Sequence, residues 1–150
     1  MSRLAVLSKV SADIERYGWQ CMSALPLAGE QGGGFAYTIG LTETLQHPEI
    51  AIFGLRAAVG HSILTGLVDE IRGGTRHAPD LPVAGLLANG FRVQFRRGRP
   101  DRVRTCFGVA AHYYQDEDFE MVIMFWPDRQ GLFPWESSTP SSQAEALDLV

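Results

Sequence analysis

Helical and strand periodicities both occur along this chain, and they do not alternate regularly. Apolar side chains recur every three or four residues over 4–17 and 57–72, which is the spacing of one helix face. Five other runs predict strands because they alternate or are largely apolar: 19–25, 35–41, 49–55, 91–96 and 120–126. Parallel βαβ units would alternate helix with strand, so this order predicts an α+β domain with two main helices and a largely antiparallel or mixed sheet.

The stretch that follows the fourth predicted strand has the pattern of a hairpin. Arg97–Pro100 has the composition of a turn, and Val103–Val109 would be the returning strand. Residues 110–114 fit either one helical turn or the end of that strand. Cys21 and Cys106 would then both lie in strands, and buried thiols are favoured over a disulfide because no Cys-x-x-Cys pair is present.

Length and composition predict one compact domain over residues 1–150. The chain is 45% hydrophobic and carries a net charge of −4, which is ordinary for a globular protein. No apolar run is long enough to cross a bilayer and no signal peptide is visible, so a cytoplasmic location is expected. Six arginines fall between Arg92 and Arg104, but a solvated strand edge explains them better than a polyanion site, and nucleic acid is not favoured.

The sequence carries no signature of a cofactor or a metal. The glycine-rich segment 29–34 lacks the Gly-x-Gly-x-x-Gly spacing and precedes a strand, so it predicts a hairpin loop instead of a phosphate cradle. The four histidines form no His-x-x-x-His pair, so no metal site is predicted. Ser62 lies inside a predicted helix and does not fit a hydrolase nucleophile.

The segment Trp126–Glu136 concentrates aromatic and proline residues. Proline cannot continue a helix or occupy a central strand, so a structured loop is expected. Asp128 begins a turn, where it would accept from backbone amides or hold Arg129. The large apolar residues that follow would either pack onto the core or line a pocket or partner surface.

Five segments together resemble the DUF4262 family, a bacterial family of domains of unknown function. They are Phe35–Leu41, His47–Glu49, Phe53–Leu55, Trp126–Asp128 and Gly131–Trp135. The resemblance runs from about Gly18 to Gln143. It implies a single compact domain and brings no established activity, cofactor or catalytic residue.

Polar and aromatic residues of these segments predict a binding pocket. The candidate ligand-binding residues are Tyr37, Thr38, His47, Glu49, Trp126, Asp128, Arg129 and Trp135. They fall at strand ends and in the loops that follow, and pockets combine apolar walls with a few polar groups of this kind. The favoured function is a binding or interaction module for a small polar ligand or a protein partner, since Trp, Tyr and Arg are common at binding hot spots.

An acid–base enzyme is the alternative. His47 would transfer a proton, Asp128 or Glu49 would orient it, and Arg129 would hold the anionic group of a small substrate. This chemistry requires His47 to reach a carboxylate directly or through a water molecule. A purely structural role for all these residues is the background interpretation, and the sequence leaves the ligand, the reaction and the oligomeric state open.

Overall fold

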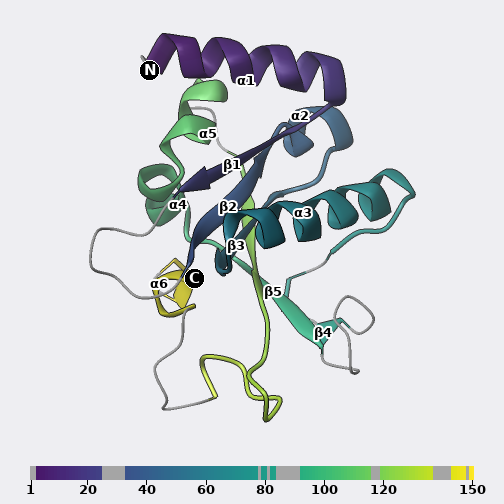
Figure 1. The fold of residues 1–150 in the computed structure, drawn as a ribbon, viewed down its shortest axis with the longest axis vertical. Helices are drawn as coiled ribbons and strands as arrows, with labels where there is room; N and C mark the ends of the chain where they lie inside the picture. Colours follow the sequence, from purple (N-terminus) through teal and green to yellow (C-terminus); the bar gives the residue numbers. More distant parts are fainter. Residues whose placement is uncertain are drawn as a thin grey trace.

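A mixed β-sheet forms the centre of the molecule (Figure 1). The computed structural model describes residues 3–24, 33–77, 79–80, 82–83, 92–115, 119–136, 143–147 and 149–150. Within these ranges the strands lie in the order β1-β2-β3-β6-β5-β4, with β3 parallel to β6 and every other neighbouring pair antiparallel. The strands are β1 (Gln20–Ala24), β2 (Gly33–Ile39), β3 (Glu49–Gly54), β4 (Pro82–Val83), β5 (Val93–Arg97) and β6 (Met121–Phe125). The predicted α+β class is confirmed.

Helices cover both faces of this sheet. They are α1 (Arg3–Tyr17), α2 (Leu41–Leu45), α3 (Ala57–Arg72), α4 (Pro100–Cys106), α5 (Gly108–Tyr113) and α6 (Ala144–Leu147). Figure 1 shows α4, α5 and α6 to the left of the sheet and α3 to the right. The two long helices, α1 and α3, are the two that the periodicity predicts. No helix within the described ranges has the length and apolar character needed to cross a membrane.

Two apolar layers lie on the two faces of the sheet. Strand alternation directs Tyr37, Phe53 and Phe125 into the layer beneath α1, α4 and α5, which we call the α1 face. It directs Ile52 and Met124 into the layer beneath α3, which we call the α3 face. Consecutive residues of one strand therefore belong to different layers, and this alternation decides which side chains can meet at a site.

Residues after β5 form two helices, α4 (Pro100–Cys106) and α5 (Gly108–Tyr113), so the predicted hairpin and returning strand are wrong. Pro100 occupies the first turn of α4, where its fixed φ favours a helix and its missing N–H costs nothing. Val103, Phe107 and Ala110 are buried at spacings of four and three residues, which is a helical period. The sequence therefore contained a helical signal that the apolar character of the segment obscured.

The structure also bears on three smaller predictions. The predicted polar connection over 42–48 contains most of the short helix α2. Cys106 ends a helix and only Cys21 lies on a strand, and the two cysteines form no disulfide. The glycine-rich segment 29–34 lies mostly outside the described residues.

Candidate functional site

A buried carboxylate organises the end of the sheet where β3 begins. Glu49 is fully buried, and its Oε1 accepts hydrogen bonds from the Thr38 hydroxyl at 2.8 Å and the Leu41 N–H at 3.2 Å. Its Oε2 accepts from the Thr42 N–H at 3.0 Å and the Tyr114 hydroxyl at 2.5 Å. A carboxylate offers about four acceptor positions, so these donors occupy all of them.

Backbone amides fix both hydroxyls as donors to this carboxylate. Thr38 Oγ1 accepts the N–H of Ile50 at 3.0 Å, and the Tyr114 hydroxyl oxygen accepts the N–H of Gly40 at 3.1 Å. Each hydroxyl proton is then directed at Glu49, an arrangement that suits an ionised carboxylate. Burial raises the pKa of Glu49 above its ordinary value, while the hydrogen bonds act in the opposite direction. Two predicted ligand contacts, Thr38 and Glu49, are therefore engaged with each other and with the backbone.

His47 lies just before this network, and both of its ring nitrogens are bonded to backbone groups. Nδ1 is 2.8 Å from the carbonyl oxygen of Pro48, and Nε2 accepts the N–H of His77 at 3.2 Å. These partners assign the ring proton to Nδ1. A hollow of about 320 Å³ is lined by His47, Pro48 and Glu120, among others. In the described part of the chain no direct hydrogen bond joins His47 to a carboxylate, although Glu120 lines the same hollow. The acid–base alternative therefore stays a prediction.

The Asp128–Arg129 turn lies at the opposite end of the sheet from His47. Because β3 and β6 run parallel, residues that precede β3 and residues that follow β6 are separated by a strand length, roughly 16 Å for five residues. Asp128 Oδ1 accepts the N–H groups of Gln130 at 2.8 Å and Leu132 at 2.9 Å, which confirms that it closes the turn through backbone amides. The structure therefore does not bring Asp128 or Arg129 to His47.

The two tryptophans of this loop pack on opposite faces of the sheet. Trp126 packs against the α3 face and Trp135 against the α1 face. Trp135 lies parallel to Phe133 with ring centroids 4.8 Å apart, and the Arg96 guanidinium carbon is 3.6 Å from the Trp135 ring centre. One pocket cannot be lined by both indoles, so Trp126 and Trp135 do not form a shared wall.

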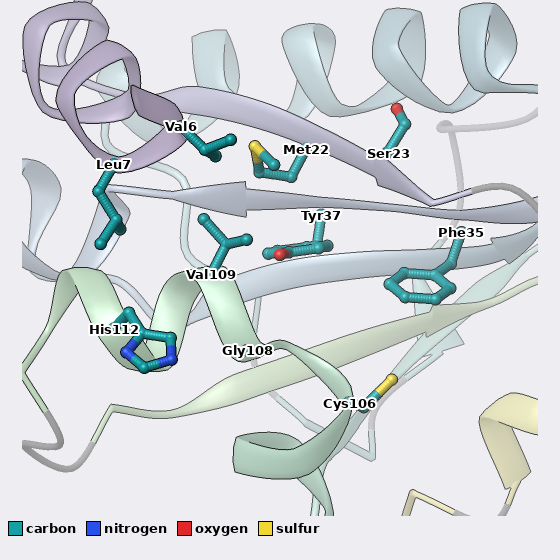
Figure 2. Close-up of a pocket in the computed structure, with 10 residues that line it drawn as sticks. All are labelled: Val6, Leu7, Met22, Ser23, Phe35, Tyr37, Cys106, Gly108, Val109 and His112. Carbon is teal, nitrogen blue, oxygen red and sulfur yellow. The ribbon is translucent and has the colours of Figure 1, made fainter. Parts of the chain in front are cut away.

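A pocket of about 490 Å³ opens on the α1 face, between α1, α5 and the sheet. Figure 2 shows Met22, Tyr37 and Val109 in its middle, with Phe35 towards one end and His112 towards the other. Of the predicted site residues, only Tyr37 is among the described residues that line it. The lining residues are Val6, Leu7, Met22, Ser23, Phe35, Tyr37, Cys106, Gly108, Val109 and His112.

The wall of this pocket that α4 and α5 provide does not follow from the sequence pattern. A strand over 103–109 would not place Cys106, Val109 and His112 on one side of the molecule, as the two helices do. The three-residue spacing of Val109 and His112, which is a helical neighbour spacing, was the available signal. No three side chains of His, Cys, Asp or Glu gather to hold a metal ion within the described ranges.

Comparison with protein families matches residues 13–140 to a family described as a domain of unknown function, DUF4262. The chain belongs to the DUF4262 family. Comparisons with curated proteins and with solved structures gave no match. The DUF4262 match begins inside α1, so it covers the sheet, the Trp126 loop and most of the pocket but leaves out Val6 and Leu7 on the α1 wall.

A second buried histidine lies against His47 in this DUF4262 domain. His77 stacks on Phe95 with ring centroids 4.8 Å apart. Its buried Nε2 has no hydrogen-bond partner among the described residues and lies 3.5 Å from Glu70 Oε2. Burial lowers the pKa of both His47 and His77 below the ordinary value of 6.5, and the repulsion between the two rings adds to this effect at His77.

These lowered pKa values predict acid sensitivity. Below the ordinary value of 6.5 the unfolded chain binds protons that the native histidines do not, so the free energy of unfolding falls as the pH decreases toward the folded-state pKa values. His77→Phe keeps a ring against Phe95 and removes one of the two groups. We expect this variant to reduce the acid-side slope by up to about 1.4 kcal/mol per pH unit. Urea unfolding at a series of pH values measures the slope, and an unchanged slope would contradict the assignment.

Proposed function

We propose that this DUF4262 domain binds a small, largely apolar molecule in the pocket between α1, α5 and the sheet. The observation that supports this proposal is the position of the Tyr37 side chain and its hydroxyl in the wall of the pocket. This side chain is only 4% exposed, it lines the pocket, and its hydroxyl has no hydrogen-bond partner among the described residues. The hydroxyl lies among the lining side chains (Figure 2), so a bound molecule that accepts or donates a hydrogen bond would give it a partner.

The dimensions of the pocket favour a small molecule over a protein partner. Its volume of about 490 Å³ lies in the range of ordinary ligand sites, which runs from roughly 300 to 1,000 Å³. Its walls are mainly aliphatic and aromatic, and its polar groups are few, as in most sites for small ligands. The bacterial source and cytoplasmic location expected from the sequence remain predictions.

Filling the pocket should abolish binding. Val109 lies in the middle of the pocket on α5, so an indole at this position would occupy the space that a ligand needs (Figure 2). With the neutral fluorescent probe N-phenyl-1-naphthylamine, we expect the unmodified chain to enhance the emission and Val109→Trp to bind about tenfold more weakly or worse. Fluorescence titration measures both affinities, and circular dichroism checks that each protein is folded.

Val59→Trp is the matched control because it makes the same substitution on α3, on the other side of the sheet. Val59 is 45% exposed, so an indole there needs no rearrangement of the core. This variant should keep the affinity of the unmodified chain. Absence of probe binding, or equal loss of binding in the two variants, would overturn the proposed function.

A further inference from the structure

We propose that this pocket selects uncharged aromatic molecules that form a hydrogen bond with the Tyr37 hydroxyl. The inference rests on the proposed function and specifies its ligand class. Three properties of the pocket carry it: the absence of Asp, Glu, Lys and Arg from its described walls, the packed aromatic rings on its floor, and the Tyr37 hydroxyl, to which no described residue hydrogen-bonds.

The described walls carry few groups that could hold a charged ligand. None of the ten described lining residues is Asp, Glu, Lys or Arg. A carboxylate or phosphate that entered would lose its hydration and find only the imidazole of His112, at one end of the pocket, as a basic partner. An ammonium group would find no Asp or Glu carboxylate on the described walls. The pocket therefore disfavours both anions and cations.

The floor of the pocket consists of aromatic rings that are held from behind. Tyr37 meets the edge of Phe107 with ring centroids 4.8 Å apart, and Phe35 stacks on Phe53 at the same distance. The ring centroids of Phe35 and Tyr37 lie 5.9 Å apart and the ring planes are inclined by 27°, so they offer adjacent ring surfaces to an occupant. Planar aromatic ligands pack well against such surfaces. Met22 also lines the pocket, and methionine sulfur makes favourable contacts with aromatic rings.

The Tyr37 hydroxyl supplies selectivity within this class. The ring is held by its neighbours, so the direction of its hydroxyl is set before a ligand arrives. A site with a preformed polar group discriminates against analogues that cannot bond to it, because the group then stays unpaired in the complex. A neutral aromatic molecule with one hydroxyl or similar group therefore fits better than the parent hydrocarbon.

The test compares 2-naphthol, naphthalene and 2-naphthoate as competitors of N-phenyl-1-naphthylamine at neutral pH. These three molecules share one ring system and differ in the presence and charge of a polar group. We expect 2-naphthol to bind most tightly, naphthalene about three- to tenfold more weakly, and 2-naphthoate most weakly. Tyr37→Phe should reduce the affinity for 2-naphthol to that for naphthalene and leave naphthalene binding unchanged.

Tyr37→Phe should also keep the stability of the native fold, since the hydroxyl that it removes has no partner in the described part of the chain. Two results would overturn the ligand class: binding of 2-naphthoate as tight as that of 2-naphthol, or an unchanged preference for 2-naphthol in Tyr37→Phe. Either result can occur while the probe still binds and Val109→Trp still blocks it. Failure of the ligand class is thereby distinguished from failure of the binding site itself.

Discussion

Glu49→Ala should lower the free energy of unfolding by about 3–5 kcal/mol. The substitution removes the acceptor of four hydrogen bonds in a fully buried position. Two of the stranded donors, the N–H groups of Leu41 and Thr42, belong to the first turn of α2 and cannot rotate towards another acceptor. Since a domain of this size is stable by roughly 5–15 kcal/mol, the loss would leave the fold marginal.

Glu49→Gln separates loss of the acceptor from loss of volume. The amide keeps the shape of the side chain but directs an NH₂ group at two donors, and we expect a cost of about 2 kcal/mol. Glu120→Ala is the control, because its side chain is exposed and only its backbone carbonyl bonds to the Glu49 N–H. It should change stability by less than about 0.5 kcal/mol. Urea unfolding measures all three, and a Glu49→Gln variant as stable as the original chain would show that the carboxyl itself carries a proton and donates.

Glu49 illustrates how a residue that is prominent in the sequence can serve the fold through a buried hydrogen-bond network. A polar residue that is prominent at the start of an apolar strand suggests a ligand contact. Its partners Thr38 and Tyr114 lie 11 and 65 residues away, and only the sheet register and the packing of α5 bring them together. Local periodicity does not reveal the sheet register or the packing of α5. The sequence alone therefore does not distinguish a buried structural network from a binding site.

The parts of the fold that local periodicity determines could be predicted. The residues of α3 recur every three or four positions along one face, and β2 and β6 form long apolar or alternating runs, so their types and approximate ends followed directly. The strand prediction for Val103–Val109 is wrong because apolar residues are close together in this segment, and a helical period is hard to recognise in helices of six or seven residues.

Strand order and direction could not be predicted from the sequence, and they determine which of the predicted site residues lie together. An antiparallel arrangement of the third and last strands would have brought the residues before Glu49 and those after Phe125 to the same end. In the structure β3 and β6 are parallel, so His47 and Asp128 lie at opposite ends. Of the eight residues proposed for one pocket, Tyr37 alone lines the pocket on the α1 face.

Trp135→Ala should destabilise the domain by about 2–4 kcal/mol and leave ligand binding unchanged. The indole packs edge-on against Phe125 at 5.2 Å, lies parallel to Phe133 and carries the Arg96 guanidinium over its ring. Removing a large aromatic side chain from a core costs about 3–5 kcal/mol, and the partial exposure of Trp135 reduces this value. The cation–π contact contributes roughly 0.5–2 kcal/mol of the total.

The same variant decides whether the loop from Trp126 to Glu136 acts in binding or in holding the fold. Leu132→Ala, at a position 36% exposed in the same loop, is the control and should cost less than about 1 kcal/mol. The loop contributes none of the described pocket residues, so the folded fraction of Trp135→Ala should bind N-phenyl-1-naphthylamine as tightly as the original chain. Unchanged stability together with lost binding would assign the loop to the ligand. The stacked rings and the guanidinium above them favour the opposite result, because they already use the indole surface that a ligand would need.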